Sequence, residues 1–431
     1  MVKVSNIKSI KAREILDSRG NPTVEVDLIT NQGLFQASVP SGVSKGKYEA
    51  VEKKAKIAVD NVNKIIAPKL KGKNPVEQKE MDNLMIKLDG TKNKSKLGAN
   101  AILAVSMAVC RAGAKSINLP LYRYISYLSR GQTSTKLSLP APSVLLIEGG
   151  AHAGNELDFQ EFMIVPQIKP FSKALQAASE IYHQLKTLIK QKYIDLAINV
   201  GDEGGFAPPV RVPEEALNLI LKVAKNLGYQ NPPPISKKQA VSEVNTTKNR
   251  WGVKIILDVA ASQFFVNGKY KMKFGVFTSE GLLRYYSDLV QRYPISGLED
   301  PFSEEDWEGF QRITKKFANR PARHLMVIGD DLLTTNPERI KEAYGKKVCN
   351  AIILKPNQIG TITEAIEAGR LAESYGWKVM VSHRSGETCD DFISDLSVGI
   401  GADFIKAGAP ARGERVAKYN RLLEIEKELH G

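Results

Sequence analysis

Six short apolar runs in the second half of the chain each end in an ionisable residue. These residues are Asp258, Glu299, Asp330, Lys355, His383 and Lys406. A turn or a helix cap explains one such residue, but it does not explain an ordered series of six. We therefore expect these side chains to take part in chemistry at the ends of buried strands.

The acidic members of this series are the kind of residues that bind a hard cation. Asp258, Glu299 and Asp330 are three carboxylates on successive predicted strands. Carboxylates that lie close together repel one another and raise one another's pKa unless a cation neutralises them. Mg²⁺ suits an oxygen-only site that leaves positions for water and substrate. We therefore expect these three residues to hold Mg²⁺.

The basic members predict the charge of the substrate. Lys355, His383, Arg384 and Lys406 form a cationic set, and Arg384 with Ser385 beside a predicted helix start could grip a phosphate. A metal on one side and cations on the other predict a cleft for a polyanion, such as a carboxylate that also carries a phosphate. A lysine base acting on such a substrate, with Mg²⁺ charge nearby, is a pattern that stabilises an ene-diolate.

The strands that must position these residues end at intervals of 41, 31, 25, 28 and 23 residues, and each interval contains a helix-like segment such as TITEAIEAGRLAESYG. Short buried strands that alternate with helices predict a parallel sheet, and this spacing predicts βα units that close into a barrel. The carboxyl ends of barrel strands meet at one mouth. An open doubly wound sheet is the alternative, although the chain lacks a glycine-rich dinucleotide fingerprint.

The first part of the chain has a different pattern. The stretch EILDSRGNPTVEVDL predicts a half-buried hairpin, in which Val24, Val26 and Leu28 alternate with polar residues. A stretch rich in Ser, Thr and Pro (129–143) predicts a connection between domains. The fold class is therefore α/β, with a smaller α+β N-terminal capping domain over residues 1–135 and a TIM-like βα barrel over residues 136–431.

The composition of the chain is typical of a globular protein. The chain has 431 residues, of which 42% are hydrophobic and 25% are charged, as in ordinary globular proteins. Its start lacks the apolar segment of a signal peptide, and its apolar stretches are too short to span a bilayer. Cys110, Cys349 and Cys389 show no CxxC spacing, which argues against a disulfide framework or a zinc site. We expect a cytoplasmic protein.

The net charge of +14 suggests an anionic partner. The Lys and Arg residues are scattered, and the sequence shows no aromatic-interleaved basic stripe and no nucleic-acid or membrane motif. Solvated surface charge is the first interpretation, an anionic small substrate the second, and nucleic acid the third.

Ten stretches in order along nearly the whole chain resemble the enolase family. They are AREILDSRGNPTVEVDL, VPSGVSKG, GGAHAGNELDFQEFM, NVGDEGGFAP, LDVAASQFF, LEDPFSEEDW, GDDLLTTNP, LKPNQIGT, SHRSGET and IKAGAPARGER. The resemblance implies a glycolytic and gluconeogenic lyase that reversibly dehydrates 2-phosphoglycerate to phosphoenolpyruvate. It also implies two Mg²⁺ ions per active site and a homodimer or higher oligomer.

The same resemblance implies roles for individual residues. Asp258, Glu299 and Asp330 hold the first Mg²⁺, and Ser44 of a glycine-flanked loop ligates the second. Lys355 removes the proton next to the substrate carboxylate, which gives an ene-diolate that the metals stabilise. The remaining implied residues assist the loss of hydroxide or bind substrate: Glu203 as the acid, Glu161 and Gln160 beside it, His152 and His383 lining the site, Arg384 and Ser385 on the phosphate, and Lys406 on the carboxylate.

The sequence departs from the usual family pattern at Lys45, Glu148, Ala407 and Gly413. Lys45 either steers an anionic substrate over long range or points into water. Two rival interpretations remain open from the sequence. One is a related dehydratase or racemase of unphosphorylated acids, which would not need SHRS or the SGVSKG loop. The other is a non-catalytic protein that binds acidic partners through its positive charge.

Overall fold

The structure is a computed structural model that describes residues 6–42, 45–132, 137–229, 252–318 and 325–430. The chain divides into two compact units. The first contains residues 1–140, 328–407 and 412–431, and the second contains residues 141–327 and 408–411. The predicted boundary between residues 135 and 136 falls outside the described residues and stays a prediction.

Strand pairing gives a closed eight-stranded barrel in the order β10-β11-β12-β13-β14-β4-β5-β6. This confirms the predicted barrel over the alternative of an open sheet. The strands are β4 (Ala141–Glu148), β5 (Glu161–Pro166), β6 (Val253–Asp258), β10 (Ile295–Glu299), β11 (Met326–Gly329), β12 (Ala351–Leu354), β13 (Lys378–Ser382) and β14 (Phe404–Lys406).

The parallel pairing predicted for the later strands is present in both units, from β6 to β10 and from β11 through β14. In contrast, β5 runs antiparallel to both β4 and β6. This reversal was not predicted, because strand direction depends on long-range pairing. It has a consequence for the site, since the first residue of β5 lies at the edge where β4 and β6 end.

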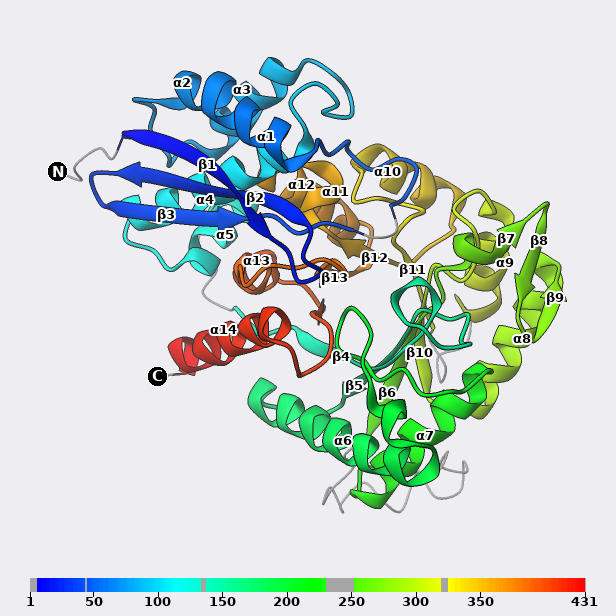
Figure 1. The fold of residues 1–431 in the computed structure, drawn as a ribbon. Coiled ribbons are helices and arrows are strands. Elements are labelled where there is room, and N and C mark those ends of the chain that lie inside the picture. Colours follow the sequence, from blue (N-terminus) through cyan, green and yellow to red (C-terminus); the bar gives the residue numbers. More distant parts are fainter. Residues whose placement is uncertain (1–5, 43–44, 133–136, 230–251, 319–324, 431) are drawn as a thin grey trace. The chain divides into compact units, whose positions relative to one another are not determined.

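The first unit contains an antiparallel sheet of β1 (Ser9–Leu16), β2 (Pro22–Thr30) and β3 (Gly33–Ser38). Leu16 pairs with Pro22 across the predicted hairpin. Val24, Val26 and Leu28 are fully buried, which confirms the predicted alternation. The apolar helix α4 (Ala99–Ser116) packs on β2 and β3 (Figure 1).

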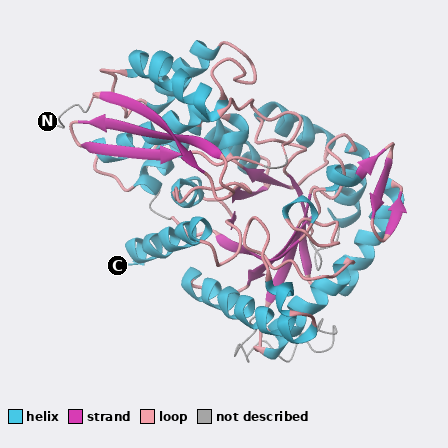
Figure 2. Ribbon diagram, in the orientation of Figure 1, coloured by secondary structure: helices cyan, strands magenta, loops and turns pink. Residues whose placement is uncertain are grey.

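The first unit also contains many helices, several of which lie beside the sheet of β1, β2 and β3 (Figures 1 and 2). Besides α4 they are α1 (Ala55–Asn61), the π-helix η1 (Val62–Ile66), α2 (Ala67–Leu70), α3 (Gln78–Asp89), α5 (Leu121–Arg130), α10 (Pro337–Lys346), α11 (Pro356–Ile359), α12 (Ile362–Ser374), α13 (Phe392–Ile400) and α14 (Gly413–His430). Local sequence sets where some of them begin. The side chain of Asn336 accepts the N–H of Glu338 at the start of α10, and Thr361 accepts that of Glu364 at the start of α12.

Within the described residues, no single helix is long and apolar enough to cross a membrane. The pair α4 and α5 passes that test only when the two are joined, and it is bent by 100°. Nearly all of α4 is buried in the first unit, as in the core helix of a globular domain.

The second unit contains the strands β4, β5, β6 and β10, and α6 packs on β4 and β5. Its helices are α6 (Phe171–Lys192), α7 (Pro213–Asn226), α8 (Ser279–Arg292), α9 (Trp307–Ala318) and the short 3₁₀ segments η2 (Gly150–His152), η3 (Asp195–Ile198) and η4 (Ala261–Phe264). A small antiparallel sheet consists of β7 (Phe265–Val266), β8 (Lys269–Met272) and β9 (Gly275–Phe277).

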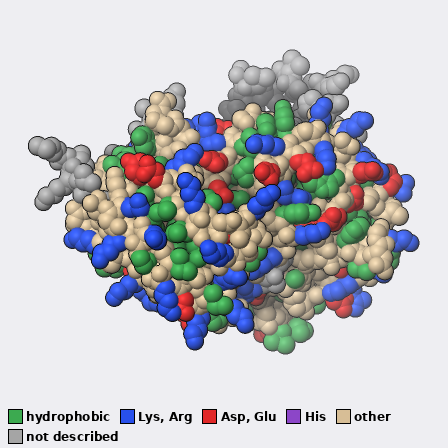
Figure 3. All heavy atoms as spheres, turned by 90° about the horizontal axis from the view of Figure 1, so that it is seen from above, with side chains coloured by type: hydrophobic (Ala, Val, Ile, Leu, Met, Phe, Trp, Pro, Cys, Tyr) green, Lys and Arg blue, Asp and Glu red, His purple; other side chains and the backbone are tan. Residues whose placement is uncertain are grey.

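Basic side chains are distributed over the surface. Figure 3 shows Lys and Arg side chains spread over the face in view, with acidic side chains between them. Many of these basic residues form ion pairs within their own unit, such as Lys79 with Glu367 and Arg292 with Glu214. This distribution supports the first interpretation of the net charge, which is solvated surface charge.

A buried ion pair joins three elements of the first unit. The guanidinium of Arg111 on α4 donates to both carboxylate oxygens of Asp390, at 2.7 and 2.9 Å. Asp390 also accepts the N–H groups of Ser38 on β3 and Phe392 on α13. Burial raises the pKa of Asp390, but Arg111 and these N–H groups outweigh burial and lower the pKa below its usual value.

We predict that Asp390→Asn lowers the free energy of unfolding by about 1–3 kcal/mol at neutral pH, because it removes the carboxylate that the largely buried Arg111 guanidinium contacts through both oxygens. The folded-state pKa of Asp390 is depressed. Its contribution is therefore present above the unfolded-state pKa of about 3.9 and is lost as the pH falls through the folded-state pKa. Urea unfolding at neutral and acidic pH measures the difference.

The matched control is Asp391→Asn, because Asp391 contacts the same guanidinium but its side chain is 40% exposed. That variant should lose no more than about 1 kcal/mol. Equal losses in the two variants, or a loss at Asp390 that does not shrink in acid, would contradict the assigned role of the pair.

Candidate active site

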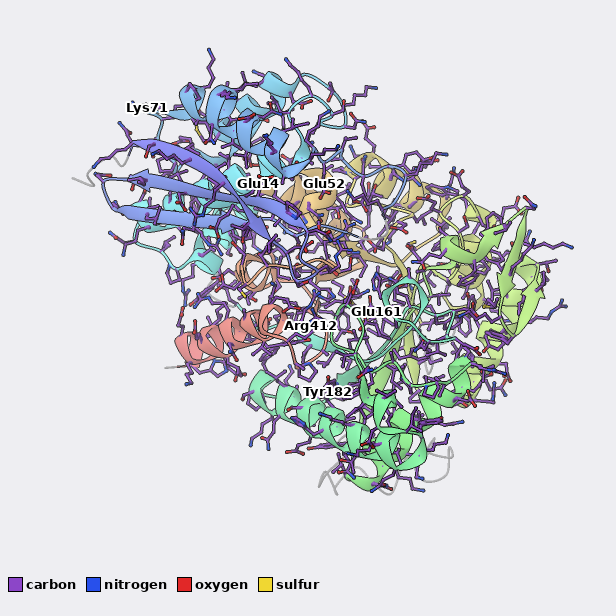
Figure 4. The ribbon with its side chains drawn as sticks, in the orientation of Figure 1. Glu14, Glu52, Lys71, Glu161, Tyr182 and Arg412 are labelled. Atoms are coloured by element: carbon purple, nitrogen blue, oxygen red, sulfur yellow. The ribbon has the colours of Figure 1, made fainter. Side chains whose placement is uncertain are left out.

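Four carboxylates lie in one row across the strands of the second unit. Register pairs Glu148 with Glu161, Glu161 with Asp258, and Asp258 with Glu299. Each residue is no more than 3% exposed. Glu161, labelled in Figure 4, joins the row because β5 is antiparallel and begins at this edge. The structure thus brings together three predicted site residues, Glu161, Asp258 and Glu299, and adds Glu148.

Gln160 fixes the position of Asp258 within this row. The backbone N–H of Gln160 donates to the carbonyl oxygen of Asp258 at 3.0 Å, and its side-chain Nε2 lies 3.3 Å from Asp258 Oδ2. The second carboxylate oxygen of Asp258 accepts the N–H of Ala260. Gln263 in turn donates to Gln160 Oε1 at 2.5 Å. The predicted residue Gln160 therefore orients a predicted metal ligand.

A second cluster of the same unit contains His152 and Glu203. His152 Nδ1 lies 3.5 Å from Glu203 Oε1 and 4.0 Å from Glu148 Oε1, and all three side chains are buried. Each residue offers a ligand atom, and these atoms lie within 4.8 Å of one another, so the cluster could hold a metal ion. The structure thus brings together two predicted site residues, His152 and Glu203.

Glu148 holds the 201–205 turn, which carries Glu203. Its Oε1 accepts the N–H of Glu203 and its Oε2 accepts that of Gly205, both at 3.0 Å. A side chain at Gly201 would lie 2.6 Å from Glu148 Cδ, so this position has no room for one. Tyr182 of α6, also labelled in Figure 4, donates to the carbonyl oxygen of Gly204 at 2.8 Å.

The first unit contains the cationic residues. Lys355, which follows β12, donates from Nζ to Asp330 Oδ2 at 2.5 Å, and Gln358 donates to Asp330 Oδ1 at 2.8 Å. Burial raises the pKa of Asp330, but the charge of Lys355, with Lys406 and Arg384, outweighs burial and lowers it. The ionised form of the Asp330 carboxylate is therefore favoured by the cations around it.

The residues His383, Arg384 and Ser385 follow β13 and are all buried. The Arg384 guanidinium lies 3.0 Å from Glu49 Oε2. Burial lowers the pKa of Arg384, but the charges of Glu49 and Asp330 raise it above its usual value. Lys406 ends β14 beside this segment, where its carbonyl oxygen accepts the N–H of His383.

The loop SGVSKG is described only in part. Ser44, the predicted second metal ligand, lies outside the described residues. Lys45 Nζ lies 2.6 Å from Glu52 Oε2, and the Lys45 side chain is 47% exposed. The charge of Lys45 is thus paired with a neighbouring carboxylate, which weakens the case for long-range steering.

Comparison with known proteins decides the family. Residues 7–125 match the family described as "Enolase, N-terminal domain", and residues 136–431 match "Enolase, C-terminal TIM barrel domain". The chain is 51% identical over 441 residues to "Enolase" of Mastigamoeba balamuthi, covering 99% of this chain and 96% of the relative. It is 50% identical over 437 residues to "Enolase B" of Dictyostelium discoideum, covering 98% and 95%.

The chain belongs to the enolase family. It is a lyase, a phosphopyruvate hydratase, as that membership establishes. The family is metal-dependent, and the buried acidic and histidine side chains of the second unit include residues that could bind a metal. The resemblance in ten sequence stretches is thereby confirmed.

Three residues that contact predicted site residues in the structure have no predicted role in the sequence. Glu148 was noted only as a departure, although a carboxylate at the end of a buried strand is itself a signal. Glu49 gave no local signal, because its contact with Arg384 joins residues far apart in the sequence. Arg415 could have been found, since it lies in helical phase with the apolar residues Leu422 and Ile425 and must be buried with them.

We predict that Glu148→Gln destabilises the protein by about 1–3 kcal/mol, because an amide nitrogen would face one of the two N–H groups and leave it buried without an acceptor. Thermal and urea unfolding measure the change. Glu156→Gln is the matched control, because the Glu156 side chain is 53% exposed and it should change stability by less than about 0.5 kcal/mol. Wild-type stability in Glu148→Gln would show that Glu148 does not hold the turn as an ionised carboxylate.

Proposed function

We propose that the chain catalyses the reversible, Mg²⁺-dependent dehydration of 2-phosphoglycerate to phosphoenolpyruvate, in glycolysis and gluconeogenesis. The observation that supports this most is the charge of the residues at the barrel strand ends. In the second unit β4, β6 and β10 end in buried carboxylates, and β5 begins with one. In the first unit Asp330 follows β11, while Lys355, the His383–Ser385 segment and Lys406 lie at the ends of β12, β13 and β14. We propose that these carboxylates and cations act on one polyanionic substrate, because the strand ends of a βα barrel share one mouth.

In this proposal Lys355 is the base. Its Nζ accepts the proton from the carbon next to the substrate carboxylate, while Lys406 binds that carboxylate. Arg384 and Ser385 bind the phosphate, because a guanidinium donates two parallel hydrogen bonds to phosphate oxygens. In the structure the Arg384 guanidinium forms an ion pair with the Glu49 carboxylate. The substrate phosphate would compete with this carboxylate for the guanidinium. His383 lines the substrate site.

Glu203 is the acid in this proposal. It gives a proton to the hydroxyl group on the neighbouring carbon, which leaves as water. His152, 3.5 Å from Glu203, and Glu161 with Gln160 line the same side of the substrate. The hydrogen bond from the N–H of Glu203 to Glu148 holds the acid in place. Proton removal and hydroxide loss are then the work of two different groups.

The donor set fits Mg²⁺. Asp258 and Glu299 are adjacent buried carboxylates, and burying neighbouring like charges is costly unless a cation is bound. We propose that Asp258, Glu299 and Asp330 hold the first Mg²⁺ and that Ser44 is a ligand of the second. When bound, Mg²⁺ supplies positive charge that stabilises the negative charge developing on the substrate carboxylate.

We propose that the enzyme works in the cytoplasm and that it forms a homodimer or a higher oligomer. Family membership supports both statements. A small-molecule substrate is its main partner, in keeping with the scattered basic surface.

We predict that the wild-type protein forms the enol product from 2-phosphoglycerate with Mg²⁺ and loses this activity in excess chelator. Lys355→Ala should lose both turnover and exchange of the substrate's α hydrogen with solvent. Glu203→Gln should keep part of the exchange while losing turnover, because only the second step needs the acid. Ultraviolet absorbance follows the product, and proton NMR in heavy water follows the exchange.

Lys346→Ala is a matched control for the lysine, because Lys346 lies half-exposed on α10 and pairs with Glu342. It should behave as wild type. Exchange at the wild-type rate in Lys355→Ala would show that the base is misassigned. Turnover of unphosphorylated acids in preference to 2-phosphoglycerate would favour the rival dehydratase or racemase.

A further inference from the structure

Helix α14 of the first unit has two cations on its buried face. Arg415 and Lys418 are both fully buried, as are Leu422 and Ile425 one and two turns further along. Both cations contact the 383–388 loop, which runs from His383 to Thr388 and includes the proposed phosphate-binding residues. Burying a cation is costly unless it is fully hydrogen-bonded, so these contacts define what the two residues do.

Lys418 contacts the C-terminal end of the 383–388 loop. Its Nζ lies 2.7 Å from Glu387 Oε2 and 2.6 Å from the carbonyl oxygen of Thr388. Glu387 Oε1 in turn accepts the N–H of Arg384 at 3.1 Å. Lys418 therefore fixes the backbone of the loop without touching His383.

Arg415 contacts the N-terminal end of the 383–388 loop and also the imidazole ring of His383. Its Nη1 lies 2.6 Å from the carbonyl oxygen of Arg384 and 2.7 Å from His383 Nδ1, and its Nη2 lies 2.6 Å from the carbonyl oxygen of Ser385. The backbone N–H of His383 donates to the carbonyl oxygen of Lys406 at 2.9 Å, which fixes the residue on the other side.

The chemistry of arginine decides the state of the ring. A guanidinium has only donor N–H groups and keeps its proton in proteins, so any atom that it contacts by a hydrogen bond must be an acceptor. A ring nitrogen accepts only when it carries no proton. Nδ1 of His383 is therefore unprotonated, and the single proton of the neutral ring lies on Nε2. The opposite ring orientation would place a carbon against the guanidinium and lose the hydrogen bond.

We infer that Arg415 is a positioning residue that keeps His383 neutral with its proton on Nε2, so that His383 serves the active site as a hydrogen-bond donor. This role in the reaction rests on the proposed function. A donor at Nε2 suits an oxygen of an anionic substrate or a water molecule, and it cannot accept a proton. Base chemistry is then left to Lys355.

The direct test is the NMR spectrum of the full chain labelled with ¹⁵N-histidine. The chain has only five histidines, and His383→Asn identifies the His383 signals by their disappearance. Without substrate and near neutral pH, His383 should show an unprotonated Nδ1 and a protonated Nε2. A ring protonated on Nδ1, or on both nitrogens, would overturn the inference.

Three variants separate this role from general support of the loop. Arg415→Met should give a mixture of ring tautomers and lower kcat for 2-phosphoglycerate by about tenfold or more, since a misplaced imidazole proton is costly in catalysis. Lys418→Met removes the other buried cation of the same helix and should leave the tautomer of His383 unchanged. Arg415→Lys keeps a donor near Nδ1 and should restore the wild-type tautomer in part.

An unchanged tautomer in folded Arg415→Met would overturn the inference, as would the same spectral change in both methionine variants. If Arg415→Met does not fold, the wild-type spectrum and Arg415→Lys still decide the matter. The spectrum without substrate does not depend on which substrate is turned over. Absence of turnover beside the expected tautomer would therefore contradict the proposed function and leave the assignment of the ring proton intact.

Discussion

Burial of ionisable groups at the ends of apolar strands is the constraint on which the rest of the site depends. A buried charge is tolerated only when hydrogen bonds, a counter-charge or a bound ion compensates it. In the second unit Glu148 meets this demand with two backbone N–H groups, and Asp258 meets it in part through Gln160 and Ala260. The proposed divalent cation would compensate the remaining charge of Asp258 and Glu299.

In the first unit the buried cations are compensated by ion pairs with carboxylates and by hydrogen bonds to backbone carbonyl oxygens. Arg384 is paired with Glu49, and Lys355 with Asp330. Arg415 and Lys418 each contact backbone carbonyl oxygens of the 383–388 loop. Binding groups that are held this firmly lose little conformational freedom when a substrate binds, which favours catalysis through prior organisation of the site.

The sequence was sufficient to predict the barrel and most of the residues at its strand ends. Asp258, Lys355 and Lys406 each close an apolar run, and the side chain at the end of a buried strand must lie at the rim of a sheet. The proposed role of Glu203 rests only on the family resemblance, because Glu203 lies in a glycine-rich loop whose local sequence also fits an ordinary turn. The glycines around His152 favour a functional histidine, but they do not specify its role.

The rest could not be predicted because it depends on long-range contacts. The reversal of β5 places Glu161 beside Asp258, and no local pattern in the sequence reports strand direction. Glu49 reaches Arg384 across more than three hundred residues. Lys45, considered for substrate steering, pairs instead with Glu52, which a single sequence does not reveal. Arg415 was overlooked although its helical phase pointed to burial.

The central claim is the proposal that Asp258, Glu299 and Asp330 hold one divalent cation. Anomalous diffraction from crystals grown with Mn²⁺ in place of Mg²⁺ tests this most directly. The account predicts an anomalous peak within about 2.0–2.2 Å of carboxylate oxygens from all three residues. A peak held instead by Glu148, His152 and Glu203, with none at the three predicted ligands, would contradict it.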